Sequence, residues 1–236
     1  MATVNNQMDV FNTQKGERLW SHAGMIETAG LLGGASPAIQ SGVVVIAYTS
    51  GEIYALKVDN GYPLWSESLS VISAVDSVSA LAHIKARPII HNGFAYLISH
   101  GGRMSAINVR SGETVWSRSI GGIRSPAISS EFLFMLSNDH YLVCFEKGTG
   151  NIVWTKDLPA RRDMKENGEQ LLWAGPVLVG QHLVLAGSHG KVIFCSPQSG
   201  EIEKVLSLED GTFLSPVVAD STLVFLTRSG RLVAYK

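Results

Sequence analysis

The hydrophobic positions of this chain fall into short runs that return at a fixed distance from proline and glycine. After Pro37, a turn residue follows fourteen positions later at Gly51, and a second glycine follows ten positions after that at Gly61. The same intervals hold after Pro88, Pro126, Pro176 and Pro216 wherever the chain is long enough to show them, with turn residues Gly102, His140, Gly190 and Gly230 and second glycines Gly112, Gly150 and Gly200. Such constant spacing indicates an internal structural repeat.

Each repeat predicts four short strands. The first begins at the proline, where the missing N–H is tolerated, and reads PAIQ, PIIH, PAIS, PVLV or PVVA. A turn such as Ser41-Gly42 leads to a continuous apolar run, for example VVVIAY or FLFMLS, which favours a strand that is covered on both faces. A third strand then leads to a fourth through a hairpin whose glycine accepts a positive φ. Four-stranded antiparallel units in series predict an all-β fold of the β-propeller type.

An aromatic residue recurs in the fourth strand, four positions after the hairpin glycine. The pairs are Gly16 with Trp20, Gly61 with Trp65, Gly112 with Trp116 and Gly150 with Trp154, whereas Gly200 is followed by Lys204. A tryptophan can bury about 150–250 Å². Because the spacing follows the repeat, we expect these tryptophans and glycines to dock neighbouring units against one another, and not to bind a ligand.

The repeat divides residues 8–236 of a single propeller domain into blades, after an N-terminal tail of residues 1–7. Four complete blades are expected at residues 36–66, 87–117, 125–155 and 175–206, with two strands of a blade at 8–22 and three strands of a last blade at 215–236. In one arrangement, the strand near the start that corresponds to the fourth strand of the repeat completes the last blade and closes a ring of five. In the other arrangement, the chain is the C-terminal part of a longer propeller. We favour this arrangement because the chain starts with a well-formed strand that corresponds to the third strand of the repeat, and a ring of five would leave that strand unused.

Composition narrows the class of partner. Hydrophobic residues make up 45% of the chain and charged residues 17%, and the formal net charge is −1, so nothing favours nucleic acid or an anionic membrane as an electrostatic partner. The longest apolar run, residues 42–48, is too short for a transmembrane segment, and the opening MATVNNQMDV does not have the pattern of an export signal. The two cysteines, Cys144 and Cys195, cannot form a disulfide framework and lie in strand-like runs, which predicts buried thiols.

The segments VFNTQKGERLW, ALKVDNGYPLW, AINVRSGETVW and CFEKGTGNIVW resemble the PQQ-type propeller repeat, A-x-D-x-x-T-G-x-x-x-W, over almost the whole chain from Met8 onward. The order of long and short linkers and the ending SPVVADSTLVFLTRSGRLVAYK resemble the BamB family of periplasmic lipoproteins, which have eight blades. The resemblance implies a scaffold at the inner face of the outer membrane that helps to assemble β-barrel proteins. The signature is degenerate, because its aspartate is replaced at Asn12, Lys57, Asn108, Glu146 and Ser196.

The resemblance also implies partner-binding residues. Members of the BamB family contact their barrel partner, BamA, through a Leu-x-Leu-Arg stretch and through two acids before a first-strand proline. The first corresponds to Leu31, Leu32 and Gly33, where the arginine is absent, and the second to His83 and Lys85, where both acids are absent. We expect a BamA-like protein, and unfolded outer-membrane proteins, as partners. No lipidation cysteine lies near the start of the chain.

Candidate chemistry is sparse. Quinoprotein dehydrogenases of this repeat class share a vicinal cysteine pair and calcium-binding carboxylates, and the chain has neither pattern. The seven histidines show no metal-binding spacing, and no G-x-S-x-G nucleophile motif occurs. We therefore predict a scaffold without enzymatic activity, cofactor or metal, whose binding residues lie on the long linkers 21–36, 66–87 and 155–175; Arg161 and Arg162 are candidates on the third. The alternatives are a fragment of a PQQ-dependent dehydrogenase and a propeller that binds another periplasmic partner.

Overall fold

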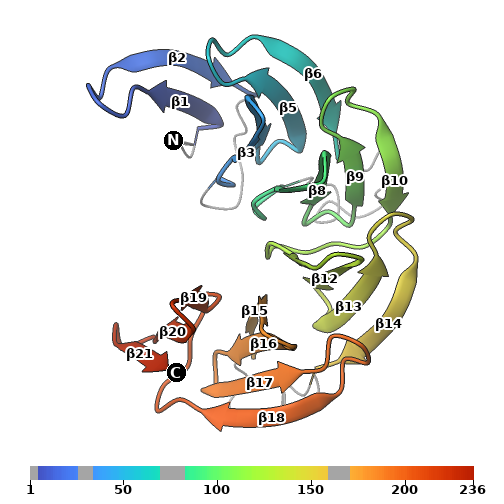
Figure 1. Ribbon diagram of the computed structural model, residues 1–236, viewed down its shortest axis with the longest axis vertical. Helices are drawn as coiled ribbons and strands as arrows, with labels where there is room; N and C mark the ends of the chain where they lie inside the picture. The colour runs from blue at the N-terminus through green and yellow to red at the C-terminus, as the bar shows by residue number, and fades with distance from the viewer. Residues whose placement is uncertain (1–4, 26–33, 70–82, 159–170) are drawn as a thin grey trace. The chain divides into compact units, whose positions relative to one another are not determined.

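The computed structural model describes residues 5–25, 34–69, 83–158 and 171–236. The chain divides into two compact units, Met1–Ser125 and Pro126–Lys236, and each is described by itself. Within the described ranges every regular element is a β-strand, and the strands form antiparallel sheets in which each strand pairs with its neighbours along the chain (Figure 1). The predicted all-β propeller fold is confirmed.

The described residues of unit 1 form three sheets. The first has two strands, β1 (Gln7–Phe11) and β2 (Arg18–Ala23). The second has four strands, β3 (Ala38–Gln40), β4 (Val43–Ala47), β5 (Glu52–Lys57) and β6 (Pro63–Ser68). The third has the same order, with β7 (Ile89–His91), β8 (Phe94–Ile98), β9 (Met104–Asn108) and β10 (Thr114–Arg118).

Three sheets are likewise formed by the part of unit 2 that the structure describes. Its first comprises β11 (Ala127–Ile128), β12 (Phe132–Leu136), β13 (Tyr141–Glu146) and β14 (Ile152–Asp157). Its second comprises β15 (Trp173–Val179), β16 (His182–Gly187), β17 (Lys191–Cys195) and β18 (Ile202–Ser207). Its third has three strands, β19 (Val217–Ala219), β20 (Thr222–Leu226) and β21 (Leu232–Tyr235).

The turns form where the sequence pattern places them, because those positions need a positive φ. The turn before each third strand has φ between 63° and 101°, at Gly51, Gly102, His140, Gly190 and Gly230. Two consecutive residues with positive φ join β7 to β8 at Asn92 and Gly93, as a two-residue hairpin of type I′ requires. In several copies a hydroxyl closes the loop before the third strand: the Ser137 Oγ accepts from the Tyr141 N–H at 3.1 Å.

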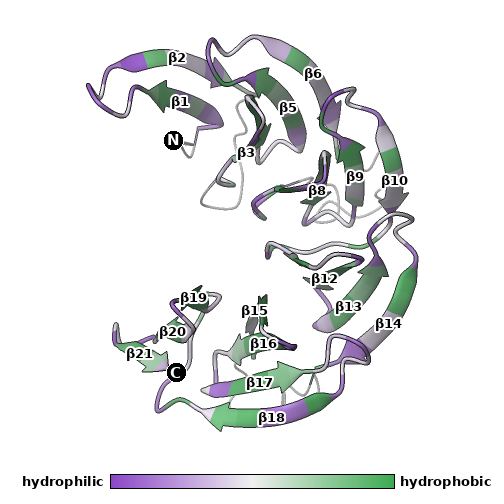
Figure 2. Ribbon diagram, in the orientation of Figure 1, coloured by the Kyte–Doolittle hydropathy of each residue, from purple (hydrophilic) through white to green (hydrophobic). Residues whose placement is uncertain are grey.

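The apolar core lies between successive sheets of a unit. Alternate residues of β4 point to opposite faces, so Val44 and Ile46 pack with Met8 of the first sheet, while Val45 and Ala47 pack with residues of β8 and β9. Covering both faces requires the continuous apolar run of this strand. In Figure 2 the hydrophobic colouring accordingly follows middle strands such as β9, β13 and β17, and the connecting turns are hydrophilic.

A β-bulge recurs at one position of the repeat, in the pairing of the third and fourth strands. In the second sheet Ala55 is opposite Trp65 and Leu56 is opposite Pro63, so Leu64 has no partner residue. The residue before the tryptophan position is skipped in the same way in the other four hairpins, at Leu19, Val115, Val153 and Glu203. The extra residue turns outward, and Leu64 is 41% exposed although it is aliphatic.

One first strand differs from the expected pattern. β15 starts at Trp173 and not at Pro176, and its pairing with β16 shifts between Ala174 and Val177. The proline therefore lies at an irregularity inside the strand, a place where a residue without an N–H is tolerated. Trp173 is buried and its ring packs edge-on against His189, with ring centroids 5.1 Å apart.

Candidate functional site

In unit 1 two of the predicted docking tryptophans reach the next sheet. The Trp20 Nε1 donates a hydrogen bond to the Val58 carbonyl at 2.8 Å, and the Trp65 Nε1 donates to the Val109 carbonyl at 2.7 Å. Both indoles are half-buried. Each indole N–H therefore has an acceptor while its ring packs against the next sheet, and an indole that leaves water needs such an acceptor. We propose that these contacts fix the spacing between sheets.

The hairpin glycines of the next sheet make room for these rings. A Cβ on Gly61 would lie 2.7 Å from the Trp20 ring, and a Cβ on Gly112 would lie 2.7 Å from Trp65 Cγ. Both glycines have a positive φ, 71° and 78°. Gly16 has the same conformation, φ 69°, but no atom lies within 4 Å of its Cβ position. The glycine therefore has two separable roles, one in the turn and one in packing.

Unit 2 repeats this arrangement once. The Trp154 Nε1 donates to the Pro197 carbonyl at 3.0 Å, and a Cβ on Gly200 would lie 2.6 Å from its ring. At the next tryptophan position, the ammonium of Lys204 lies 5.4 Å from the centroid of the Phe194 ring, a cation–π contact. The lysine thus stays on its own sheet.

The remaining two predicted docking residues can be placed within their own units. Trp116 is buried and lies near Tyr96, with ring centroids 6.0 Å apart, and the Arg118 guanidinium is 5.9 Å from its ring. Gly150 is buried and has φ 69°.

The position that the repeat signature assigns to aspartate has a structural role here, although asparagine occupies it in two of the copies. The Asn108 Oδ1 accepts from the N–H groups of Arg110 and Ser111, and the Asn12 Oδ1 accepts in the same way from Gln14 and Lys15. This Asx-type turn needs only an acceptor oxygen two and three residues before the two loop amides. The need for an oxygen and not for a charge accounts for the asparagines.

A cluster of polar and aromatic side chains, which the sequence reasoning did not identify, joins the first two sheets of unit 1. The His22 Nδ1 is 2.9 Å from the Tyr48 hydroxyl, and its ring centroid is 4.4 Å from that of Tyr54. Glu52 accepts hydrogen bonds from the Tyr54 hydroxyl, the Ser50 hydroxyl and the Met25 N–H at 2.7–2.8 Å. These residues come from two short segments, 22–25 and 48–54, which are separate in the sequence, so no single local motif indicates the cluster.

The environment of this cluster shifts its pKa values. Burial lowers the pKa of His22, and the negative charge of Glu52 opposes this in part. Burial raises the pKa of the Tyr48 hydroxyl, and its neighbours Tyr54 and Glu52 add to the rise. For Glu52, burial alone would raise the pKa, but the hydrogen bonds from Met25, Tyr54 and Ser50 lower it overall. At neutral pH the cluster therefore pairs a neutral imidazole with a carboxylate.

The predicted partner-binding residues are only partly described. Of the pair before Pro88, His83 is buried, with its carbonyl accepting from the His100 N–H at 2.8 Å, whereas Lys85 is exposed. Lys85 is thus the one of the two that can meet a partner directly. Leu31, Leu32, Gly33, Arg161 and Arg162 lie outside the described residues.

Reactive groups are not gathered into a site in the part of the chain that the structure describes. Cys144 and Cys195 are buried in one apolar cluster, and burial raises the pKa of each thiol to about 12. Among the described residues, no group of three or more histidine, cysteine, aspartate or glutamate side chains could hold a metal ion. The same ranges contain no helix with the length and apolar character that a membrane crossing needs.

Comparison with known families decides the relationship that the repeat suggests. The model of the family described as outer membrane protein assembly factor BamB matches residues 1–156. The chain belongs to this family. A BamB from Yersinia pestis is 22% identical over 234 residues, which are 99% of this chain and 57% of that protein. A BamB from Alkalilimnicola ehrlichii is 26% identical over 207 residues, or 87% of this chain and 52% of that protein.

Solved structures agree on the fold. The crystal structure of BamB from Moraxella catarrhalis superimposes with a TM-score of 0.83 at 19% identity, covering 98% of this chain and 66% of that one. A quinohemoprotein alcohol dehydrogenase from Comamonas testosteroni has a TM-score of 0.65 at 13% identity and covers 88% of this chain. The chain spans about half the length of the curated BamB relatives that it matches.

Proposed function

We propose that this chain is a non-catalytic protein-interaction scaffold of the machinery that assembles outer-membrane β-barrel proteins, and that it acts in the periplasm at the inner face of the outer membrane. The observation that carries the proposal is the family match, supported by relatives named as outer membrane protein assembly factors. The proposed main partner is a BamA-like protein, with unfolded outer-membrane proteins as further partners.

The physical character of the sheets suits this role. Hydrogen bonds from indoles to main-chain carbonyls join successive sheets, and apolar clusters fill the space between them. A rigid scaffold of this kind lets exposed connections present side chains at low entropic cost when a partner binds. Lys85, on the connection between β6 and β7, is the proposed contact that can be tested within the described residues.

The test is a titration of the purified chain with the purified periplasmic part of a BamA protein from the same cell, measured by calorimetry. We expect saturable binding that Lys85→Glu weakens, while Lys57→Glu, an exposed lysine at the end of β5, leaves it unchanged. Equal affinity of both variants would remove Lys85 from the interface. Absence of binding would favour another periplasmic partner.

A second titration addresses the dehydrogenase alternative. The chain is mixed with PQQ and Ca²⁺, and absorbance and reduction of an electron-acceptor dye by added alcohol are recorded. We expect no stoichiometric binding and no dye reduction, because the cysteines are buried in an apolar cluster and are not vicinal. Saturable binding together with dye reduction would overturn the scaffold proposal.

A further inference from the structure

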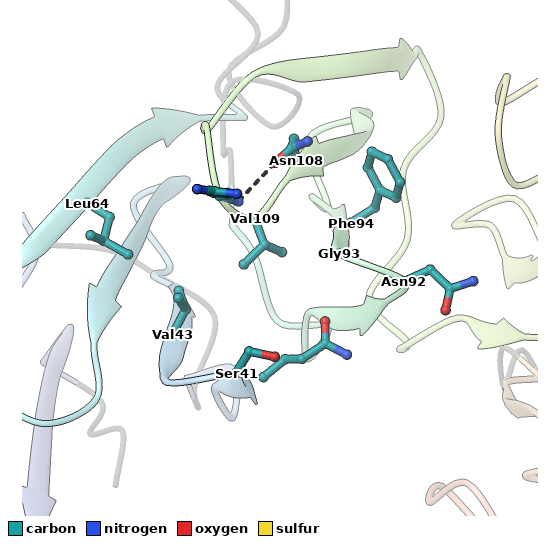
Figure 3. Close-up of a pocket in the computed structure, with 10 residues that line it drawn as sticks. Ser41, Val43, Leu64, Asn92, Gly93, Phe94, Asn108 and Val109 are labelled. Carbon is teal, nitrogen blue, oxygen red and sulfur yellow. Dashed lines mark hydrogen bonds between the residues drawn. The ribbon is translucent and has the colours of Figure 1, made fainter.

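A pocket of about 520 Å³ lies between the second and third sheets of unit 1 (Figure 3). It is formed where the turn from β3 to β4 and strand β6 face the turn from β7 to β8 and the loop from β9 to β10. Its volume is within the range of about 300–1,000 Å³ found for ligand pockets. Neither the repeat pattern nor the proposed BamA contact accounts for it.

The walls of the pocket are apolar. They are formed by Val43, Leu64, Phe94 and Val109. Val109 is buried, whereas Leu64, the bulge residue of β6, is 41% exposed and borders the pocket from the side opposite Phe94 in Figure 3. An aliphatic side chain of a ligand would cover this exposed Leu64 surface and bring its own apolar surface out of water.

The rim of the pocket is polar and carries a positive charge. Gln40 and Asn92 supply carboxamides, which both donate and accept hydrogen bonds as a peptide backbone requires. Arg110 is the single charged residue among those that line the pocket, and it is exposed. Within the described residues, the guanidinium of Arg110 and the two carboxamides make no hydrogen bond or ion pair. Their bonding capacity is therefore open to a ligand, and the guanidinium complements a carboxylate.

We propose that this pocket binds a short peptide through one aliphatic side chain and through the carboxylate of the acidic residue that directly follows it. The aliphatic side chain enters between Leu64 and Phe94, the carboxylate meets Arg110, and the backbone lies along the carboxamides of the rim. The proposal does not depend on the assembly partner proposed above, because it concerns unit 1 alone and can be tested with defined peptides.

The probe is the fluorescein-labelled peptide Gly-Ser-Leu-Asp-Ser-Gly with an amidated C-terminus, titrated with the full chain and followed by fluorescence anisotropy. We expect a dissociation constant on the order of 0.1–1 mM. Replacing the peptide's leucine by serine, or its aspartate by asparagine, should weaken binding about fivefold or more. N-acetyl-leucine serves as a small-molecule competitor and should compete at least about tenfold more weakly than the unlabelled peptide.

Variants of the protein locate the binding. Arg110→Gln should weaken binding of the Leu-Asp peptide about fivefold and leave the Leu-Asn peptide unchanged, since only the charge pair is removed. Leu64→Ser should weaken both peptides about fivefold. The matched controls are Lys57→Gln, an exposed cation in the same unit, and Leu19→Ser, the bulge residue of the first sheet, and neither should change the affinity.

The proposal is overturned if no binding occurs up to about 5 mM protein. It is also overturned if Arg110→Gln and Leu64→Ser bind as the unchanged protein does. Competition by N-acetyl-leucine as strong as that of the peptide would show a small-molecule pocket and would likewise overturn the peptide proposal. Circular dichroism of both variants shows whether a loss of binding reflects a loss of folding.

Discussion

The docking of indoles against hairpin glycines gives a prediction whose magnitude follows from the structure. Gly112 and Gly16 occupy the same place in the repeat and have φ of 78° and 69°. An alanine in this left-handed conformation costs about 1–2 kcal/mol. At Gly112 the new Cβ would also lie 2.7 Å from Trp65 Cγ, so the overpacking adds about 1–3 kcal/mol. We therefore expect Gly112→Ala to lower the free energy of unfolding by about 2–5 kcal/mol and Gly16→Ala by about 1–2 kcal/mol.

The assay is urea-induced unfolding followed by far-ultraviolet circular dichroism, with both variants and the unchanged chain measured at the same temperature. Both glycines lie in unit 1, so the difference between the variants reports the packing against Trp65 and not the turn. Measured against Trp65→Ala alone, the added change Gly112→Ala should cost little more than Gly16→Ala does, because the ring that the new Cβ would meet is gone. Equal destabilisation by Gly16→Ala and Gly112→Ala would refute the docking role of the indole.

Three further predictions concern other contacts. Trp65→Phe should lower the free energy of unfolding by about 1–3 kcal/mol, because the Val109 carbonyl loses its donor, and urea titration measures this loss. The pKa of His22 is lowered by burial, so the unfolded chain binds its proton more readily; stability should fall as the pH drops below about 6.5, and His22→Gln should flatten this part of a stability profile against pH. Cys144 and Cys195 should not react with a thiol reagent at pH 8 in the folded chain but should react in urea, since thiols with a pKa of about 12 supply almost no thiolate; rapid labelling of the native protein would contradict their burial.

The fold could be predicted because its strongest constraints are local. A turn with positive φ favours glycine or asparagine at one position, so the spacing from Pro37 to Gly51 and Gly61 records the strand lengths directly. The strand β15 departs from this pattern because an irregular pairing inside a strand lets the strand continue N-terminal of Pro176 to Trp173. Periodicity does not show such an extension.

The sites were harder to predict because their residues meet only in space. A single repeat does not indicate the bulge that exposes Leu64, since an aliphatic residue before a tryptophan looks like any other strand residue. The contact of His22 with Tyr48 joins two sheets and has no motif. The repeat as a whole does carry a signal. An aliphatic residue precedes the tryptophan in four copies, at Leu19, Leu64, Val115 and Val153, and all four of these residues are exposed.

The indoles of Trp20, Trp65 and Trp154 all donate to a main-chain carbonyl, and the residues that carry those carbonyls are Val58, Val109 and Pro197. Every amino acid offers the same oxygen, so mutation at the accepting position leaves the hydrogen bond intact. Most other residues at the contact between successive sheets can therefore change during evolution, provided that the tryptophan and the glycine are retained. Relatives that share only about a fifth of their residues with this chain can in this way keep one architecture.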